Sequence, residues 1–398
     1  MRARDFEDAA PGALIQTING AHAFVPDPLP EKLDLTAEIV LQLESATLAI
    51  GRLDQLGRSL VNPHLLVQPF VRREAVASSR MEGTTADLGQ LLLFEATRQS
   101  PASDSDVREV ANYVAAVDYG LRRPRERPVS LGLIREMHQI LLDGVRGEQY
   151  NLGDFRDRQN WISGSDRSIS SARFVPPPPD QVNGLMRDLE RYWQTSDRSP
   201  ALVRLALVHY QFETIHPFFD GNGRLGRLLM AVLLDDWQVL TRPLLYLSTA
   251  IERRRVEYHD ELLRVSQSGN WSSWISFFLD AVLVSADDAL QRGNRLIDLQ
   301  DRYRIQYGSG GSTTPLKILD LLFETPAFTV SEMSRRVGIG FKAIQSSVDR
   351  LASDGVLVEV TGQRRHRVYV ASEIVAAVSS PEPNSFPDTD GAEGRLHA

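Results

Sequence analysis

The chain has 398 residues, of which 42% are apolar and 24% charged, a composition that supports packed domains and excludes a wholly disordered chain. The 44 basic and 52 acidic residues give a net charge of −8, which excludes a uniformly basic nucleic-acid-binding surface. Cysteine is absent, which excludes disulfides, thiol catalysis and cysteine-ligated metals. Apolar runs are short and no leader-like segment opens the sequence, so we expect a soluble cytoplasmic protein without a membrane partner.

Helical periodicity dominates the chain from about residue 33 to residue 307. Residues 1–33 contain scattered glycines and prolines and predict an irregular lead-in. Apolar residues then recur at spacings of three and four within 33–94, 107–121, 131–142, 182–193, 201–215, 224–237, 252–265 and 271–307. Residues 151–179 break this pattern with Gly, Ser and four consecutive prolines, which indicates a hairpin or loop on a helical body.

The C-terminal quarter differs in composition. Residues 308–314 form a Gly/Ser-rich linker, and residues 371–398 are rich in Pro, Ser, Asp and Glu, which predicts a disordered tail. Between them, residues 315–370 predict a helix (316–324), a helix opened by a capping signal at Val330-Ser331 (332–337), a helix (341–353) and two strands around the basic turn 363–367. This order is typical of a winged helix-turn-helix, which binds DNA or mediates dimerisation; eight basic against six acidic residues do not decide between the two.

The central region contains the run His216-Pro-Phe-Phe-Asp-Gly-Asn-Gly-Arg-Leu-Gly-Arg227. Its G-x-G-x-x-G pattern is not a dinucleotide fingerprint, because the preceding residues have helical rather than strand spacing. We predict instead that a helix ends near Ile215, a glycine-containing loop turns, and a new helix begins around Gly223. Helix N-termini carry unpaired N–H groups and bind anions, so the run indicates a phosphate site.

Four side chains of this run suit chemistry at phosphorus. Arg224 and Arg227 lie one turn apart at a helix N-terminus, where positive charge is unfavourable unless an anion accompanies it. Asp220 offers a hard oxygen ligand for Mg²⁺, and His216 is a candidate base. No lysine lies between residues 33 and 316, which excludes a P-loop or Schiff-base lysine in this region.

The run resembles the signature of the Fic family, H-x-F-x-[D/E]-G-N-G-R-x-x-R, at every specified position, and the similarity extends over about residues 62–282. The resemblance implies a helical Fic core with a small β-hairpin flap and transfer of AMP from ATP to a hydroxyl of a target protein. It makes His216 the base and Asp220 the Mg²⁺ ligand. It also implies that Asn222, Arg224 and Arg227 contact the α-, β- and γ-phosphates respectively. The ATP-binding residues of the signature are Gly221, Asn222, Gly223, Arg224, Gly226 and Arg227.

A second segment, Ser78-Ser-Arg-Met-Glu82-Gly83, resembles the family's inhibitory motif [S/T]-x-x-x-E-[G/N]. The pattern is short and is informative only beside the signature. The resemblance implies that Glu82 pairs with Arg227 and displaces the γ-phosphate, so we predict an autoinhibited enzyme.

Two further segments are similar to family elements that hold the substrates. Residues 155–175 resemble the flap that pairs with the target backbone. The residues expected to make this contact are Ile162, Ser163 and Gly164. Tyr258 and His259 resemble residues that flank the adenine pocket, although His259 and Ser266 depart from the usual residues there.

The predicted fold is mainly α, divided into an N-terminal helical region with the inhibitory motif (1–100), a Fic core (101–307), a linker (308–314), a winged helix-turn-helix (315–370) and a tail (371–398). Self-modification, a homodimer and DNA binding remain open. Two alternatives also remain: a DNA-binding regulator whose Fic core senses nucleotide, and a Fic enzyme that transfers another phosphate-containing group. The intact His216 disfavours the regulator, since sensing needs no base.

Overall fold

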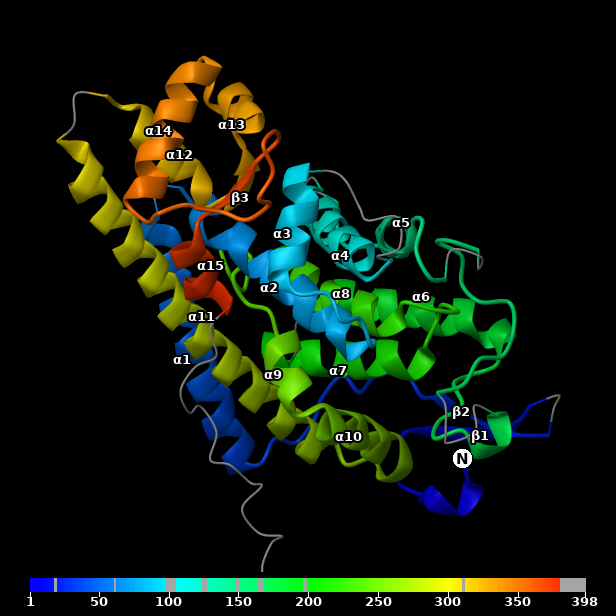
Figure 1. Cartoon of the computed structure of the whole chain (residues 1–398). Helices are drawn as coiled ribbons and strands as arrows, with labels where there is room; N and C mark the ends of the chain where they lie inside the picture. Colours follow the sequence, from blue (N-terminus) through cyan, green and yellow to red (C-terminus); the bar gives the residue numbers. More distant parts are fainter. Residues whose placement is uncertain are drawn as a thin grey trace, which may run out of the picture.

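The computed structural model describes residues 1–17, 20–60, 62–97, 105–123, 127–147, 151–162, 168–195, 199–309 and 312–379. These residues form a mainly helical protein with two small antiparallel sheets, which confirms the predicted fold class (Figure 1). None of the described helices has both the length and the apolar character needed to cross a membrane.

The N-terminal segment is more ordered than the sequence predicted. After a short 3-10 helix (Ala3–Asp5), β1 (Gly12–Gln16) pairs antiparallel with β2 (His22–Pro26), so the expected irregular lead-in is wrong for these residues. The backbone N–H of Phe24 donates to the carbonyl of Val175 at 2.9 Å. This bond fastens the hairpin to the proline-rich segment that precedes α6.

Two long helices form one side of the molecule. α1 (Ala37–Ser59) begins at Thr36, whose side chain accepts from the N–H of Ile39, and it packs along α11 (Trp271–Gly308), as Figure 1 shows. α2 (His64–Met81) crosses α11 and ends next to Glu82. The helices that follow are α3 (Leu88–Thr97), α4 (Ser105–Arg122) and α5 (Leu131–Leu142).

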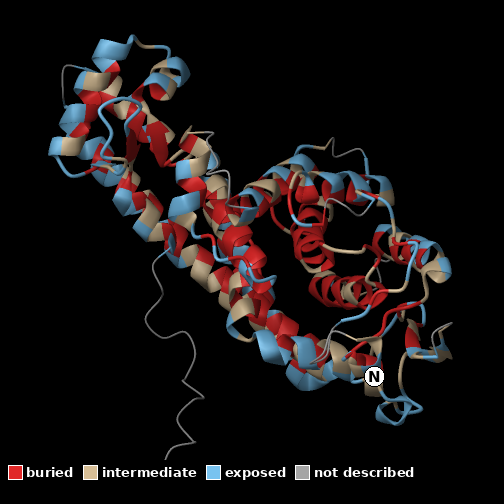
Figure 2. Cartoon of the chain, turned by 45° about the vertical axis from the view of Figure 1, so that its right-hand side comes forward, coloured by how far each residue is buried: buried red, intermediate tan, exposed pale blue. Residues whose placement is uncertain are grey.

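The centre of the core is α8 (Asn222–Asp236), which follows α6 (Pro179–Thr195) and α7 (Ala201–Ile215). All residues of α8 except Gly223 and Asp236 are buried, because α2, α4, α5 and α7 pack around it (Figure 2). A helix surrounded on all sides cannot turn its charged residues to water. The two arginines in its first turn must therefore be compensated inside the protein.

The helix predicted over residues 252–265 is divided in the structure. α9 (Ser248–Arg253) and α10 (Arg255–Ser268) meet at Arg254, whose backbone (φ −116°, ψ 35°) lies outside the helical range. The break lets α10 turn along the same cavity as α7, where Tyr258 becomes buried.

The C-terminal unit has the predicted element order with one added strand. Its elements are α12 (Thr314–Leu322), β3 (Ala327–Thr329), α13 (Val330–Val337), α14 (Phe341–Ser353), β4 (Val358–Glu359) and β5 (Val368–Val370), and the sheet order is β3-β5-β4. The capping prediction was wrong by two residues, because Thr329 accepts from the N–H of Glu332 at 3.3 Å. Assignment of this unit as a winged helix-turn-helix stays a prediction.

The predicted tail is wrong for its first residues. Ser372–Ser379 form α15, which packs on α11 and α2 with Ile374 and Val378 buried. The guanidinium of Arg292 donates to the carbonyl of Val378 at 2.8 Å and so caps this helix. The short apolar pattern of α15 becomes stable only against the surface that α2 and α11 supply. Residues 380–398 of the predicted tail lie outside the described residues.

Candidate active site

His216 lies directly after the last residue of α7, in the left-handed region of backbone conformation (φ 50°). Residues other than glycine seldom adopt this conformation, so the surroundings must hold it. The N–H of His216 donates to the carbonyl of Phe212 at 3.0 Å, and Nε of the buried Arg156 donates to the carbonyl of His216 at 2.9 Å. These two hydrogen bonds hold the backbone at the end of α7, and the imidazole of His216 points into a cavity.

The ring of His216 is prepared to accept a proton. Its Nδ1 lies 3.3 Å from the carbonyl oxygen of Glu213. Because a carbonyl only accepts, Nδ1 carries the hydrogen and Nε2 keeps a free lone pair. Burial lowers the pKa of His216 to about 4, and the positive charge of Arg156 adds to this effect. The imidazole is therefore neutral at pH 7, as a general base requires.

The loop between His216 and α8 is held from several sides. The amide of Asn222 bonds both the N–H and the carbonyl of Phe218, each at 2.8 Å. Asn160 donates to the same carbonyl at 3.0 Å, and His138 stacks on the Phe218 ring and bonds the carbonyl of Asp220 at 3.1 Å. Asn222 thus fixes the loop in this structure, while its predicted contact with an α-phosphate stays a prediction. Sequence reasoning missed His138, since a lone histidine in an amphipathic helix carries no signal.

Two glycines give the start of α8 its shape. Gly221 has φ 77°, the left-handed conformation that favours glycine, and its N–H donates to Oδ1 of Asp220 at 2.6 Å. A Cβ on Gly223 would collide with Oε1 of Glu82. Glycine at this position therefore allows an acidic group to approach the N-terminus of the helix closely.

The predicted contact between Glu82 and Arg227 is present. Nη2 of Arg227 donates to Oε1 of Glu82 at 2.7 Å, and Ser78 accepts from Arg227 through Oγ and the carbonyl oxygen, both at 2.9 Å. Burial would raise the pKa of Glu82, but the charge and the hydrogen bond of Arg227, together with the nearby charge of Arg224, lower the pKa overall, so the pair is ionised. The Arg227 side chain is 1% exposed and that of Glu82 is 36% exposed. Gly83, with φ 95°, turns the chain away after α2.

Arg224 is also buried, and it bonds a different acid. Its Nη1 donates to Oε2 of Glu109 on α4 at 2.8 Å, and both side chains are 1% exposed. Its Nη2 lies 3.7 Å from Oδ1 of Asp220, and Nη2 of Arg146 lies 3.6 Å from Oε2 of Glu109. Arg224 and Arg227 lie three residues apart on α8, and neighbouring segments supply each with a different acid, Glu109 on α4 and Glu82 after α2.

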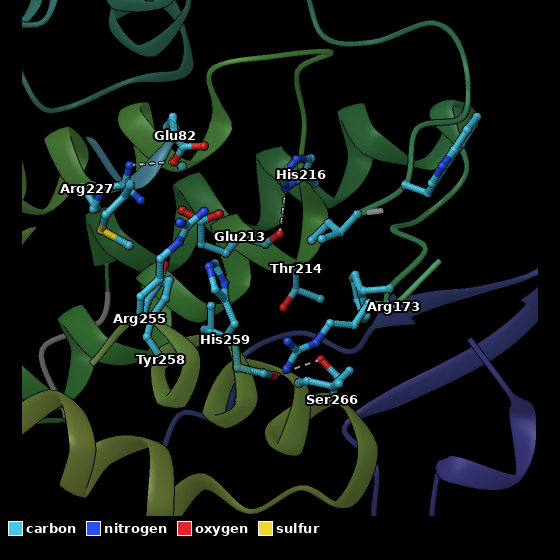
Figure 3. A pocket seen from close by; sticks show the side chains of 17 residues that line it. Glu82, Arg173, Glu213, Thr214, His216, Arg227, Arg255, Tyr258, His259 and Ser266 are labelled. Carbon is cyan, nitrogen blue, oxygen red and sulfur yellow. Dashed lines mark hydrogen bonds and ion pairs between the residues drawn. The ribbon is translucent and has the colours of Figure 1, made fainter. Parts of the chain in front are cut away.

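Eight of the residues that the sequence singled out line one cavity of about 530 Å³. Figure 3 shows the Glu82–Arg227 pair at one side of it, His216 across from the pair, and residues of α10 below. The lining residues that the sequence singled out are Glu82, Ile162, His216, Gly223, Arg227, Tyr258, His259 and Ser266. The lining does not include Asp220, Gly221, Asn222, Arg224 or Gly226.

The α10 side of the cavity has its own anchoring bonds. The hydroxyl of Tyr258 bonds Nε2 of His209 at 2.8 Å, and Oγ of Ser266 bonds the hydroxyl of Tyr210 at 2.9 Å. His259 is exposed and lies at the rim. Tyr258 is thus fixed as part of the wall, and His259 is the freer of the two predicted adenine neighbours.

Glu213 is a cavity residue that sequence reasoning missed. Its side chain lies close to Gly226, and its buried Oε1 has no hydrogen-bond partner among the described residues. Burial raises the pKa of Glu213 to about 7, although the nearby Arg227 opposes this shift. The available signal was the single acid of α7, three residues before His216.

Only part of the predicted flap lies within the described residues. Ile162 and Phe174 form an antiparallel bridge in which the N–H of Ile162 donates to the carbonyl of Phe174 at 2.9 Å. Trp161 and Ile162 line the cavity and are 38% and 37% exposed. Ser163 and Gly164, the other two predicted contact residues, lie outside the described residues.

The residues present fit a Mg²⁺ ion shared with a phosphate better than a self-contained metal site. No group of three or more His, Asp or Glu side chains suitable for a metal occurs in the described part of the chain. Oδ1 of Asp220 is engaged, whereas Oδ2 has no hydrogen-bond partner among the described residues and the side chain is 36% exposed. Mg²⁺ commonly binds one or two carboxylates together with substrate phosphates and water.

Comparisons with known proteins agree with this geometry. The Fic/DOC family N-terminal model matches residues 40–122, and the Fic/DOC family model matches residues 128–234. Proteins named protein adenylyltransferase Fic from Drosophila ananassae and Drosophila yakuba are 27% and 28% identical over 215 residues, 52% of this chain. The match spans only 39% of the length of each of these curated relatives.

A solved structure extends the similarity to the fold. A Fic family protein from Desulfovibrio desulfuricans superimposes with a TM-score of 0.57 at 20% identity, covering 85% of this chain and 97% of that chain. At this level of identity the likeness concerns the fold alone. The two family models, with the signature placed at the start of α8, assign residues 40–122 and 128–234 of this chain to the Fic/DOC family.

Proposed function

We propose that this protein is an ATP-dependent protein adenylyltransferase, which transfers AMP to a hydroxyl side chain of a target protein or of itself. The observation that carries the proposal is a neutral His216 that faces the same cavity as Arg227 and the N-terminus of α8. The activity in the names of the curated relatives supports the same reaction.

The proposed reaction is a displacement at the α-phosphorus of ATP. Nε2 of His216 takes the proton from a Tyr, Thr or Ser hydroxyl, and the freed oxygen forms a bond to the α-phosphorus. The bond from this phosphorus to the bridging oxygen breaks, and pyrophosphate leaves. Backbone N–H groups around Gly221 and Gly223 bind phosphate oxygens. Mg²⁺ held by Asp220 would offset the phosphate charge.

Glu82 inhibits this reaction by occupying the place of a phosphate. Its carboxylate is bonded to Arg227 and lies against Gly223, where a nucleotide phosphate would otherwise bind. The carboxylate is also partly exposed at the cavity, so it can move into water when Arg227 changes partner. Arg227 then becomes available for the γ-phosphate.

The test uses ATP labelled at the α or the γ position, with wild type, Glu82→Gly and His216→Ala. We expect protein labelling from the α position only, at least tenfold more with Glu82→Gly and absent with His216→Ala. Because burial holds the pKa of His216 near 4, labelling by Glu82→Gly should stay level between pH 8 and pH 6. Label from the γ position would show phosphoryl transfer instead, and bound ATP without label would favour the nucleotide-sensing regulator.

The C-terminal unit carries a separate proposal, that it is a winged helix-turn-helix that binds DNA. It is supported by the exposed basic turn between β4 and β5, which includes Arg364, Arg365 and Arg367. Fluorescence anisotropy with a 30-base-pair duplex at two salt concentrations tests it. Arg364→Ala/Arg365→Ala should weaken binding, and absence of binding together with a dimer in sedimentation would favour a dimerisation module.

A further inference from the structure

The buried acid on α4 that faces the first turn of α8 belongs to neither signature motif. Glu109 is 1% exposed, although acidic residues almost never lie inside a protein unless they are paired. Its Oε2 accepts from Nη1 of Arg224 at 2.8 Å. A charged group placed so deeply is costly unless its partner is fixed, so this pair is a permanent part of the core.

Arg224 is buried near the start of α8. Its side chain is 1% exposed, and neither Arg224 nor Asp220 is among the residues that line the cavity containing His216 and Arg227. Nε of Arg224 has no hydrogen-bond partner among the described residues, but that atom is closed off from solvent as well.

The second terminal nitrogen of Arg224, Nη2, faces Asp220, the predicted metal ligand. Nη2 lies 3.7 Å from Oδ1 of Asp220, the same oxygen that accepts from the N–H of Gly221 at 2.6 Å. The guanidinium of Arg224 and the N–H of Gly221 thus hold Oδ1 of Asp220, and Oδ2 is left for a cation. Outer partners that orient a ligating carboxylate commonly change metal affinity 10- to 100-fold when they are replaced.

We propose that Glu109 is a positioning residue of the reaction, which holds Arg224 so that Arg224 orients the carboxylate of Asp220 toward the nucleotide-bound cation. This inference rests on the proposed function. In this structure the side-chain partners of Arg224 are Glu109 and Asp220, and its contact with the β-phosphate stays a prediction.

The experiment measures Mn²⁺ binding calorimetrically in the Glu82→Gly background, with α,β-methylene-ATP present as a nucleotide that cannot release AMP. We expect Glu109→Gln to raise the dissociation constant of Mn²⁺ about 10- to 100-fold. Affinity for the same nucleotide in EDTA should change less than twofold, and labelling from α-labelled ATP should recover to within about threefold at saturating Mg²⁺. A role limited to general stability would not separate these three quantities.

The matched control is Glu261→Gln. Glu261 is also buried and paired, with Arg264, but it lies on α10 and outside the cavity lining. Its replacement should leave Mn²⁺ affinity unchanged. If Glu109→Gln is unfolded by near-ultraviolet circular dichroism, Glu109→Asp keeps the charge, and we then expect Mn²⁺ affinity to fall several-fold.

Two results would overturn the proposal. Unchanged Mn²⁺ affinity in the folded Glu109 variant would remove the positioning role. A loss of nucleotide affinity in EDTA as large as the loss of Mn²⁺ affinity would make Arg224 a phosphate ligand. If the Glu82→Gly protein binds nucleotide and Mn²⁺ but transfers no AMP, the proposed function fails, and the Mn²⁺ measurement still decides the role of Glu109.

Discussion

Two arginine–glutamate pairs meet the first turn of α8, and they differ mainly in access to water. Arg227 and Arg224 are equally buried, and each bonds a carboxylate at nearly the same distance, 2.7 Å and 2.8 Å. Glu82, however, is 36% exposed at the end of α2, whereas Glu109 is 1% exposed within α4. Two contacts of similar length can therefore behave differently, because only the exposed carboxylate of Glu82 can leave its arginine and be solvated by water.

The physical reason is the cost of an unpaired buried charge. If Glu109 left Arg224, both groups would remain in a medium that solvates them poorly. When Glu82 leaves Arg227, the carboxylate moves into water, and Glu213 remains close enough to Arg227 to offset part of its charge. The first pair suits a fixed support, and the second suits an inhibitory contact that opens.

The largest difference should appear in stability. We expect Glu109→Ala to lower the free energy of unfolding by about 3–5 kcal/mol, because it strands Arg224 in the core. Glu82→Ala should cost only about 1 kcal/mol, because its side chain is partly exposed and solvent screens the pair. Urea unfolding at pH 7.5 measures both values, and equal losses would contradict the distinction between the pairs.

Glu213 sharpens the comparison, because it lies beside Arg227 without a hydrogen bond at Oε1. Burial raises its folded-state pKa to about 7, above the usual value of 4.5 for a glutamate. Its contribution to stability is thus complete below pH 4.5 and is lost as the pH rises through about 7. Glu213→Gln should match wild type near pH 4.5 and be more stable by about 3 kcal/mol at pH 8.

Unfolding free energies of the two proteins across this pH range test the prediction. The surface variant Glu38→Gln serves as the control and should show no such pH dependence. A difference between Glu213→Gln and wild type that stays constant with pH would show that Glu213 is ionised throughout.

The hydroxyl of Ser78 should contribute less than either glutamate. Ser78→Ala removes one hydrogen bond from Nε of Arg227, while the carbonyl of Ser78 and the carboxylate of Glu82 still hold Nη2. We expect a loss of about 1 kcal/mol in unfolding free energy. AMP transfer should rise, but by less than with Glu82→Gly.

The neighbouring Ser79 provides the matched control for this change. It is equally buried, and its Oγ has no hydrogen-bond partner among the described residues. Ser79→Ala should therefore leave AMP transfer unchanged. An equal rise in both variants would show that loosening of α2, and not the Ser78 contact, releases Glu82.

The smallest expected effect is the response to salt. Raising NaCl from 0.05 to 0.5 M screens the partly exposed Glu82 and should reduce the activity ratio of Glu82→Gly to wild type by up to about twofold. Taking the ratio at each salt concentration cancels the effect of salt on ATP binding. The stability difference produced by Glu109→Ala should change less with salt, because the Glu109 and Arg224 side chains are each only 1% exposed.

The local elements of the site were predictable because they depend on short-range geometry. The turn after Ile215, the new helix at the Gly-Asn-Gly run and the two glycines at its start follow from neighbouring residues. The Glu82–Arg227 contact was predictable only through the family resemblance, since the two residues are 145 positions apart.

The partners of the signature residues were not predictable from spacing. Glu109 follows Arg108 in an amphipathic helix and resembles a surface charge until α4 packs against α8. His138 has the spacing of an ordinary helical residue, and its stacking on the ring of Phe218 is visible only in the structure. The segment that forms α15 has the composition of a tail and becomes a helix against α2 and α11.

The sequence by itself determined the mainly helical class, the chemistry of the His216–Arg227 run and the residues at its turn, because these depend on periodicity and on conformations that few residues adopt. Only the tertiary structure decided which charged side chains are buried, as Glu109 is, and which are exposed to water, as Glu82 is. Burial is a property of how α2, α4 and α8 pack together, and it makes Glu109 a fixed partner and Glu82 a removable one.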